Sequence, residues 1–269
     1  KYIETYICPI FEYIISSKKK KFLIAGSQGI GKSTLLYILE KNLKIIYNKE
    51  ILSLSLDDYY LTKKQRVSLS KKIHPLLITR GVPGTHDIKK LLKHVRCFER
   101  SIYPINIPIF DKLNDDRLTK VKKIKTKADI LILEGWCCAS PAVPNSFLKK
   151  NINQIEKIFD RDLRWRNYYN HQLQNQYARL FKKFEKVIYL KVPSFSYIQN
   201  WRLKQEKMMK TRNNHIDAMD RKQILEFILH YEKITKWMMK VLPSKANLTI
   251  NVDKNQKIKK ILFKKITTD

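Results

Sequence analysis

The chain has 269 residues, 43% of them hydrophobic, which is enough to bury the core of an α/β fold. It carries 55 lysines and arginines against 24 aspartates and glutamates, giving a formal net charge of +31. No apolar run approaches the roughly 20 residues that span a membrane, and the first residues lack the pattern of a signal peptide. These features argue against a membrane or secreted protein and favour an anionic ligand.

The predicted secondary structure alternates between strands and helices. Buried strands are expected at 22–25, 51–56, 130–133, 186–192 and 248–252. Amphipathic helices are expected at 33–43, 87–98, 194–210 and 220–241. Alternating strands and helices favour a parallel sheet with crossover helices. No repeat or low-complexity linker interrupts the pattern, so we expect one domain over residues 1–269.

Three of the six glycines fall in the stretch GSQGIGKS, between the first predicted strand and helix. The stretch fits G-x-x-x-x-G-K-[ST], in which glycines let main-chain N–H groups converge on phosphates at a helix N-terminus. Lys32 is expected to reach the β- and γ-phosphates, and the Ser33 hydroxyl to bind Mg²⁺. The expected nucleotide-binding residues are Gly26, Ser27, Gln28, Gly29, Ile30, Gly31, Lys32, Ser33 and Thr34. The motif predicts phosphate binding but does not identify a reaction.

Acidic side chains follow the second and third predicted strands. Asp57 and Asp58 come directly after the second strand, and Glu134 closes the third. Ligands bind at the carboxyl ends of strands in such sheets, where a carboxylate can hold Mg²⁺ or accept a proton. We therefore expect Asp57 to be catalytic, with Ser33, Asp57 and Glu134 as metal ligands and Asp58 near the substrate. The alternative for the Asp57–Asp58 pair is a helix N-cap.

Two loops carry mixtures of charged and polar groups that suit a small anionic substrate. RGVPGTHD spans residues 80–87, and a second cluster follows the apolar segment PINIPIF. An anionic group on such a substrate needs a fixed cation, for which Arg80 is the first candidate, with His86 or Lys112 assisting. The alternatives are an ordinary Pro-Gly turn that caps the next helix and a solvated loop. The expected substrate-binding residues are Asp58, Arg80, Thr85, His86, Asp87, Asp111 and Lys112.

A basic helix near the C-terminal third supplies candidates for a lid. The stretch WRLKQEKMMKTR covers residues 201–212, with Arg202 as first candidate and Arg212 as second. A lid arginine would neutralise charge on the transferred phosphoryl oxygens together with Lys32. The alternative is a basic helix surface. Aromatic residues in the helical pattern at 159–181 favour core packing over ligand contact.

The set GSQGIGKST, SLDDYYLT, RGVPGTHD, IPIFDK, ILILEGW and WRLKQE resembles the D-glycerate 3-kinase family of plants, fungi and cyanobacteria. RGVPGTHD and LEGW are specific to that family, whereas uridine kinases, phosphoribulokinases and bacterial pantothenate kinases share the P-loop and DDYY. The resemblance implies a doubly wound, mostly parallel α/β sheet flanked by helices. It also implies transfer of the ATP γ-phosphoryl group, with Mg²⁺, to the 3-hydroxyl of D-glycerate. By position, Asp57 matches the strand-end base, and Arg80, His86 and Asp87 fall in the substrate-facing loop.

The resemblance also implies a layout for the chain. Residues 1–269 would form a single P-loop kinase domain, with a lid at about 200–215 and substrate-facing insertions at about 75–90 and 108–125. The segment after FDK is shorter than usual in the family, and Arg117 stands in for the family arginine there. The segment after WRLKQEKMMK lacks the usual glycine.

Two other functions fit parts of the pattern. One is a P-loop kinase for a nucleoside or pantothenate, although RGVPGTHD lacks the aromatics that would stack a base. The other is a nucleic-acid-dependent NTPase, suggested by charge alone. The lysine excess runs from end to end with abundant Ile and Asn, which indicates compositional bias, so no specific nucleic-acid or membrane partner is expected. Four cysteines without C-x-x-C spacing favour a reducing cytoplasm. The sequence gives no indication of oligomeric state.

Overall fold

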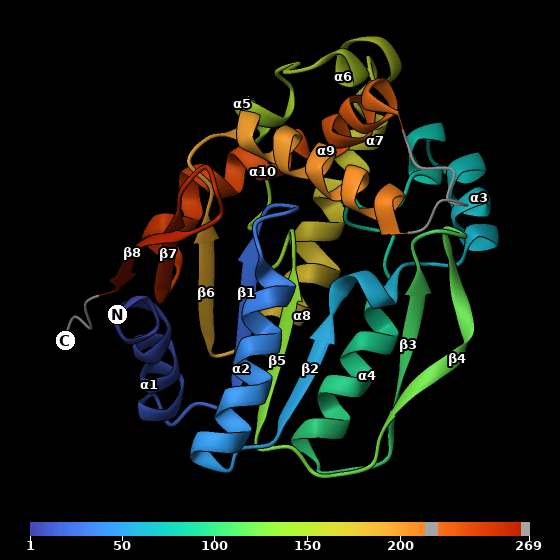
Figure 1. Ribbon diagram of the computed structural model, residues 1–269. Coiled ribbons are helices and arrows are strands. Elements are labelled where there is room, and N and C mark those ends of the chain that lie inside the picture. The colour runs from blue at the N-terminus through green and yellow to red at the C-terminus, as the bar shows by residue number, and fades with distance from the viewer. Residues whose placement is uncertain (213–219, 265–269) are drawn as a thin grey trace.

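The computed structural model describes residues 1–212 and 220–264, and their side chains except those of residues 205–212. Its main sheet has the order β2-β5-β1-β6-β7-β8 (Figure 1). The strands are β1 (Lys21–Gly26), β2 (Ile51–Ser55), β5 (Ile130–Gly135), β6 (Lys186–Lys191), β7 (Leu248–Val252) and β8 (Ile258–Phe263). Neighbouring strands are parallel except β7 and β8. The predicted mostly parallel sheet is therefore confirmed. The edge strand β8 was not predicted, because lysines interrupt its apolar residues.

Helices cover both faces of this sheet (Figure 1), as expected for a doubly wound fold. Side chains of β1 alternate between two cores: Phe22 and Ile24 face one, and Leu23 and Ala25 face the other. The first core is closed by α1 (Cys8–Ser16), α2 (Lys32–Tyr47) and the start of α9 (Phe195–Arg212). The second is closed by α4 (Ile88–Glu99), α7 (Arg164–Gln172), α8 (Ala178–Phe181) and α10 (Arg221–Lys245).

A two-stranded hairpin, β3 (Ile105–Asp111) and β4 (Asp116–Ile124), lies beside α4 at the end of the molecule opposite β8 (Figure 1). The sequence predicted only the extended segment that becomes β3. The other short elements are η1 (Ile3–Ile7), η2 (Leu56–Tyr59), α3 (Lys63–Lys72), η3 (Pro75–Ile78), α5 (Asn145–Leu148), α6 (Gln154–Phe159) and η4 (Leu173–Tyr177). Among the described residues, none of the helices has the length and apolar content needed to span a bilayer.

The aromatic-rich segment 159–181 packs into the interior. Trp165, Tyr169 and Tyr177 are buried in the core that contains α10, which confirms the packing interpretation. Arg166 is fully buried in the same segment and donates from Nε to Asp160 at 2.6 Å. Buried charges of this kind need partners, and the pair fixes the start of α7.

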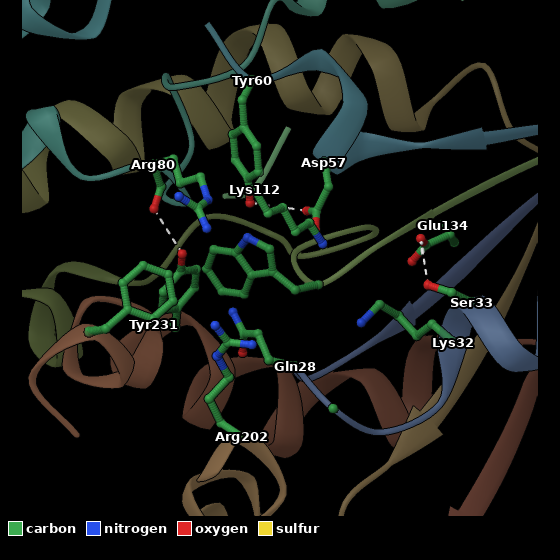
Figure 2. A pocket seen from close by; sticks show the side chains of 13 residues that line it. Gln28, Lys32, Ser33, Asp57, Tyr60, Arg80, Lys112, Glu134, Arg202 and Tyr231 are labelled. Atoms are coloured by element: carbon green, nitrogen blue, oxygen red, sulfur yellow. Dashed lines mark hydrogen bonds and ion pairs between the residues drawn. The ribbon is translucent and has the colours of Figure 1, made fainter. Parts of the chain in front are cut away.

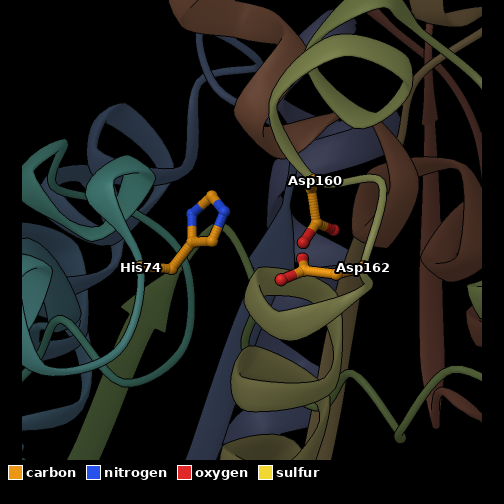
Figure 3. Close-up of side chains that lie close together, drawn as sticks. All are labelled: His74, Asp160 and Asp162. Carbon is orange, nitrogen blue, oxygen red and sulfur yellow. The ribbon is translucent and has the colours of Figure 1, made fainter.

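One group of possible metal ligands lies in this region (Figure 3), formed by His74, Asp160 and Asp162. Nδ1 of His74 accepts a main-chain N–H of its own turn at 3.2 Å, and Nε2 lies 2.9 Å from the carbonyl of Phe159. Both ring nitrogens are therefore used within the protein. Asp160 is likewise occupied by Arg166. We interpret the group as a structural junction between η3 and α7.

Candidate active site

The first loop of the site connects β1 directly to α2. Gly29 and Gly31 adopt φ angles of 74° and 102°, which glycine reaches at little cost. Ile30 between them is 1% exposed and anchors the loop in the core. Lys32 begins α2, and its Nζ donates to the carbonyl of Ser27 at 3.0 Å, so the ammonium lies over the loop. The loop thus has the strand–turn–helix form that the motif predicts.

Glu134 lies beside this loop at the end of β5. In the sheet register it pairs with Ile24 of β1 and Ser55 of β2, which places its carboxylate at the carboxyl edge of the sheet. Its Oε1 accepts hydrogen bonds from the hydroxyls of Ser33 at 3.1 Å and Ser55 at 2.8 Å. Carboxylate and hydroxyl oxygens are the hard ligands that Mg²⁺ prefers. Ser33 and Glu134, two of the three predicted metal ligands, are therefore in direct contact.

Asp57 lies in η2, directly after β2. Its Oδ2 accepts from Lys112 Nζ at 2.8 Å, and its Oδ1 accepts from the hydroxyl of Tyr60 at 3.0 Å. Burial alone would raise the pKa of Asp57, but the charges of Lys112 and Lys32 outweigh burial and hold the pKa well below its usual range. The carboxylate is therefore ionised throughout the neutral range and is held at both oxygens.

Arg80 is held on the opposite side of the site. Its guanidinium forms an ion pair with Asp115 and lies over two rings, 5.6 Å from the centroid of Phe110 and 5.9 Å from that of Phe227. Its main-chain carbonyl accepts a hydrogen bond from the hydroxyl of Tyr231 at 2.8 Å. Side chain and backbone are thus both fixed, which orients the guanidinium before any substrate arrives.

The glycines of the RGVPGTHD loop have a packing role. Gly81 has a φ of 134°, and a Cβ there would come 2.1 Å from the hydroxyl of Tyr231 on α10. The carbonyl of Gly81 accepts a hydrogen bond from Trp136 Nε1 at 2.9 Å. The loop is thus packed between α10 and the segment after β5, and a larger residue at Gly81 would displace the Tyr231 side chain.

One pocket brings these groups together (Figure 2), with Lys32, Ser33 and Glu134 on one side and Arg80 and Tyr231 on the other. It is lined by Gln28, Gly29, Lys32, Ser33, Asp57, Tyr60, Arg80, Lys112, Glu134, Trp136, Arg202, Phe227 and Tyr231. Four of these side chains are cationic and two are carboxylates, so the pocket favours anionic ligands. Arg202, from α9, lies with its guanidinium 5.9 Å from the Phe227 ring.

Three residues of the RGVPGTHD loop that were predicted to contact substrate do not line this pocket. Thr85 is fully buried, and its hydroxyl donates to the carbonyl of Val82 at 2.8 Å within the turn. His86 is stacked on Tyr60 at 4.4 Å between centroids, and burial lowers its pKa to about 3. Asp87 caps α4. The three side chains contact the turn itself, Tyr60 and the N-terminus of α4, so their role here is to hold the loop in place.

Two further predicted substrate residues have other positions. Asp111 accepts main-chain N–H groups at the tip of the β3–β4 hairpin, so its side chain shapes that turn. Asp58 accepts one long hydrogen bond, 3.5 Å from the N–H of Phe110, and burial raises its pKa to about 6. Neither lines the pocket. Arg117, expected to replace a family arginine, donates instead to the carbonyl of Tyr60 at 2.7 Å and buttresses the turn after Asp57.

Sequence reasoning missed several residues of the pocket. Tyr60 follows Asp57 by three positions, and the turn of η2 returns its hydroxyl to the carboxylate. Phe227 and Tyr231 are four residues apart on α10 and therefore share a face. The same spacing is typical of core packing, so the sequence offers no signal that separates the two roles. The sequence favours Asp111 over Asp115, although Asp115 is the residue that holds Arg80.

Comparisons with known proteins identify relatives of the chain. No protein-family model matches the chain. The chain is 30% identical over 242 residues to the uncharacterized kinase mug58 of Schizosaccharomyces pombe, covering 84% of this chain and 83% of the yeast protein. It is 25% identical over 218 residues to the chloroplastic D-glycerate 3-kinase of Arabidopsis thaliana, covering 77% of this chain and 45% of the plant protein. The chain belongs to the D-glycerate 3-kinase family of P-loop kinases.

A solved structure supports the fold of this family member. The D-glycerate 3-kinase from Cryptococcus neoformans superimposes with a TM-score of 0.78 at 24% identity, covering 96% of this chain and 98% of the fungal chain. Together with the sequence relatives, the comparisons support a P-loop kinase of the glycerate kinase type.

Proposed function

We propose that the protein transfers the γ-phosphoryl group of ATP to the 3-hydroxyl of D-glycerate, giving 3-phosphoglycerate and ADP. The observation that carries the proposal is the pocket in which Lys32 and Arg80 face each other across Asp57. A P-loop lysine at one end suits a triphosphate. A rigid guanidinium at the other end suits a carboxylate. The alcohol to be phosphorylated would then lie between them, beside Asp57.

The nucleotide half uses the loop of residues 26–34. Its main-chain N–H groups and the N-terminus of α2 would bind the phosphates, with Lys32 at the β- and γ-phosphates. Ser33 and Glu134 would hold Mg²⁺, directly or through water, together with Asp57. The oxygen-rich donor set on these side chains fits that ion. The ion would neutralise charge on the phosphoryl oxygens.

The acceptor half binds and activates glycerate. Arg80 pairs with the substrate carboxylate, and Lys112 lies beside Asp57 to complete an anion-binding side. Asp57 accepts a hydrogen bond from the 3-hydroxyl and takes its proton as the new P–O bond forms. The bond from the γ-phosphorus to the leaving oxygen of ADP breaks in the same step. Asp57 is ionised at neutral pH, which is the form that can accept this proton.

Arg202 and Lys32 neutralise the charge that spreads over the transferred oxygens. The proposed lid at about 200–215 begins within α9, whose described backbone ends at Arg212. The Arg212 side chain and residues 213–215 lie outside the described residues. The proposed setting is a reducing cytoplasm, where the free cysteines are stable and the partner is a small molecule.

The test is product identification. The full chain is incubated with MgATP and D-glycerate, and phosphorus–proton NMR correlation shows which carbon carries the phosphoryl group. We expect a single product phosphorylated at carbon 3, with ADP release far above that seen with uridine or pantothenate. Phosphorylation at carbon 2, or faster turnover of uridine or pantothenate, would overturn the proposal. The same preparation carrying Lys32→Met controls for contaminating kinases.

A further inference from the structure

The turn between β7 and β8, residues 253–257, is rigid and lies against the P-loop. The N–H of Asp253 donates to the carbonyl of Lys257 at 2.8 Å, and the N–H of Gln256 donates to the carbonyl of Asp253 at 3.1 Å. The carboxylate of Asp253 accepts the N–H groups of Asn255 and Lys257 at 2.8 and 2.9 Å. Gln256 itself has a φ of 65°. These hydrogen bonds restrict the backbone conformation at Gln256, from which its side chain extends.

Two contacts make this turn a bridge between the nucleotide loop and the base of the lid helix. The side-chain amide of Gln256 donates to the carbonyl of Gly29, in the centre of the P-loop. The second contact is to α9, where Trp201 donates from Nε1 to the carbonyl of Lys254 in the turn at 2.8 Å. Trp201 is 4% exposed and directly precedes Arg202. The turn therefore sets the P-loop relative to α9.

The bond to Gly29 has a consequence for the next residue, because a trans peptide unit is planar. The C=O of one residue and the N–H of the next then point in opposite directions. When Gln256 holds the Gly29 carbonyl on its own side of the loop, the N–H of Ile30 is directed to the other side. The side chain of Ile30, buried at 1% exposure, holds the far end of the same peptide unit.

Two residues flank this peptide. Gly29 has a φ of 74° and no side chain, so it offers little resistance to rotation of the Gly29–Ile30 peptide, whereas the buried side chain of Ile30 resists it. A rotated peptide would turn a carbonyl oxygen toward a bound phosphate in place of an N–H donor. The phosphate would then face a repulsive oxygen where it had a hydrogen-bond donor. The hydrogen bond from Gln256 acts at the Gly29 end of the peptide, where the chain itself offers least resistance, and so favours the anion-binding orientation.

We propose that Gln256 is a positioning residue of the nucleotide site, which orients the Gly29–Ile30 peptide toward the triphosphate from the β7–β8 turn. The inference rests on the proposed function only in taking a nucleotide as the ligand of the P-loop. It does not depend on the identity of the acceptor. Because Gln256 acts through the loop backbone, it should affect nucleotide affinity without affecting the acceptor.

The test compares Gln256→Glu with Asn255→Asp in the full chain. Both variants replace an amide by a carboxylate in the same turn, but Asn255 is exposed and its side chain does not hold the P-loop. A third variant, Gln256→Met, removes the donor without adding charge. The readouts are the Kd for MgATP by titration calorimetry, the KM values for both substrates, and the midpoint of thermal unfolding.

We expect Gln256→Glu and Gln256→Met to weaken MgATP binding by about 10- to 100-fold. This is the range for losing the hydrogen bond from the Ile30 N–H to the charged phosphate, about 10- to 100-fold. The KM for D-glycerate should stay unchanged, the unfolding midpoint should fall by no more than about 4 °C, and Asn255→Asp should bind MgATP like the wild type. Equal weakening in Asn255→Asp and Gln256→Glu, or none in Gln256→Met, would overturn the inference alone. Failure of the wild type to bind MgATP would instead overturn the proposed function.

Discussion

The phosphate-binding part of the proposed nucleotide end comes from one continuous stretch, residues 26–34, with Glu134 of β5 beside it, whereas the proposed acceptor end combines Arg80, Lys112 and Tyr231 from three distant segments. The phosphate-binding stretch needs only a strand, a turn rich in glycine and a helix that begins at Lys32. The acceptor end exists only when the Arg80 loop, the β3–β4 hairpin and α10 are packed together. A phosphate site is thus a local property of this chain, and an acceptor site is a tertiary one.

The two ends also treat their charges differently. At the nucleotide end, Glu134 accepts hydrogen bonds from two serine hydroxyls, which a metal ion can replace without breaking an ion pair. At the acceptor end, Asp57 pairs with Lys112 and Arg80 pairs with Asp115. These pairs hold the cations in place before substrate binds. Substitutions at the two ends should therefore give different kinetic signatures.

Lys32→Met should cause the largest loss and should affect every acceptor equally. Removing a group that stabilises transition-state charge typically lowers kcat by about 10²–10³, and Lys32 would act on the phosphoryl group alone. The measurement is kcat with D-glycerate and with any weaker acceptor that the enzyme accepts. Lys41→Met is the control, because Lys41 is exposed on the same helix. A loss confined to D-glycerate would show that the two ends are not independent.

Arg80→Ala should act on the acceptor alone. Loss of a charge-assisted contact to the substrate carboxylate should raise the KM for D-glycerate by about 10- to 100-fold, while the KM for ATP stays within about 2-fold of the wild type. Arg80→Lys should recover only part of the loss, because lysine lacks the guanidinium fork. Steady-state kinetics with each substrate varied in turn makes the measurement.

Arg202→Ala provides the contrast to Arg80→Ala, since its expected effect is on kcat with little change in either KM. An unchanged KM for D-glycerate in Arg80→Ala would remove the acceptor assignment. It would leave the nucleotide end intact.

The difference between local and tertiary parts of the pocket explains which of its residues the sequence could predict. The P-loop, Asp57 and Glu134 could be found because motif spacing and strand ends are local properties. The importance of Asp115 could not, because it depends on the β3–β4 hairpin, which returns Asp115 toward Arg80. Phe227 was missed for a similar reason, since a helix with aromatic residues at helical spacing looks the same whether it faces a core or a pocket. Thr85 was predicted at the site because sequence does not show which way a turn points.

A smaller effect, on stability, should come from Asp58→Asn. Asp58, which follows Asp57 but does not line the pocket, accepts one long hydrogen bond, in contrast to Glu134 with its two hydroxyl donors. Burial raises the pKa of Asp58 from 3.8 to about 6, so the folded state binds a proton more tightly than the unfolded state. The free energy of unfolding should therefore fall as pH rises through this interval, and ionised Asp58 is a cost at neutral pH.

Asp58→Asn removes that cost and keeps an oxygen for the N–H of Phe110. The full shift corresponds to at most about 3 kcal/mol, and partial solvent exposure reduces the expected gain to about 1 kcal/mol at pH 7.5. At pH 3, where the carboxyl is mostly protonated in both states, the gain should nearly vanish. Urea unfolding of both proteins at the two pH values measures it. An equal gain at both pH values would show that the gain comes from packing and not from removal of the buried Asp58 charge.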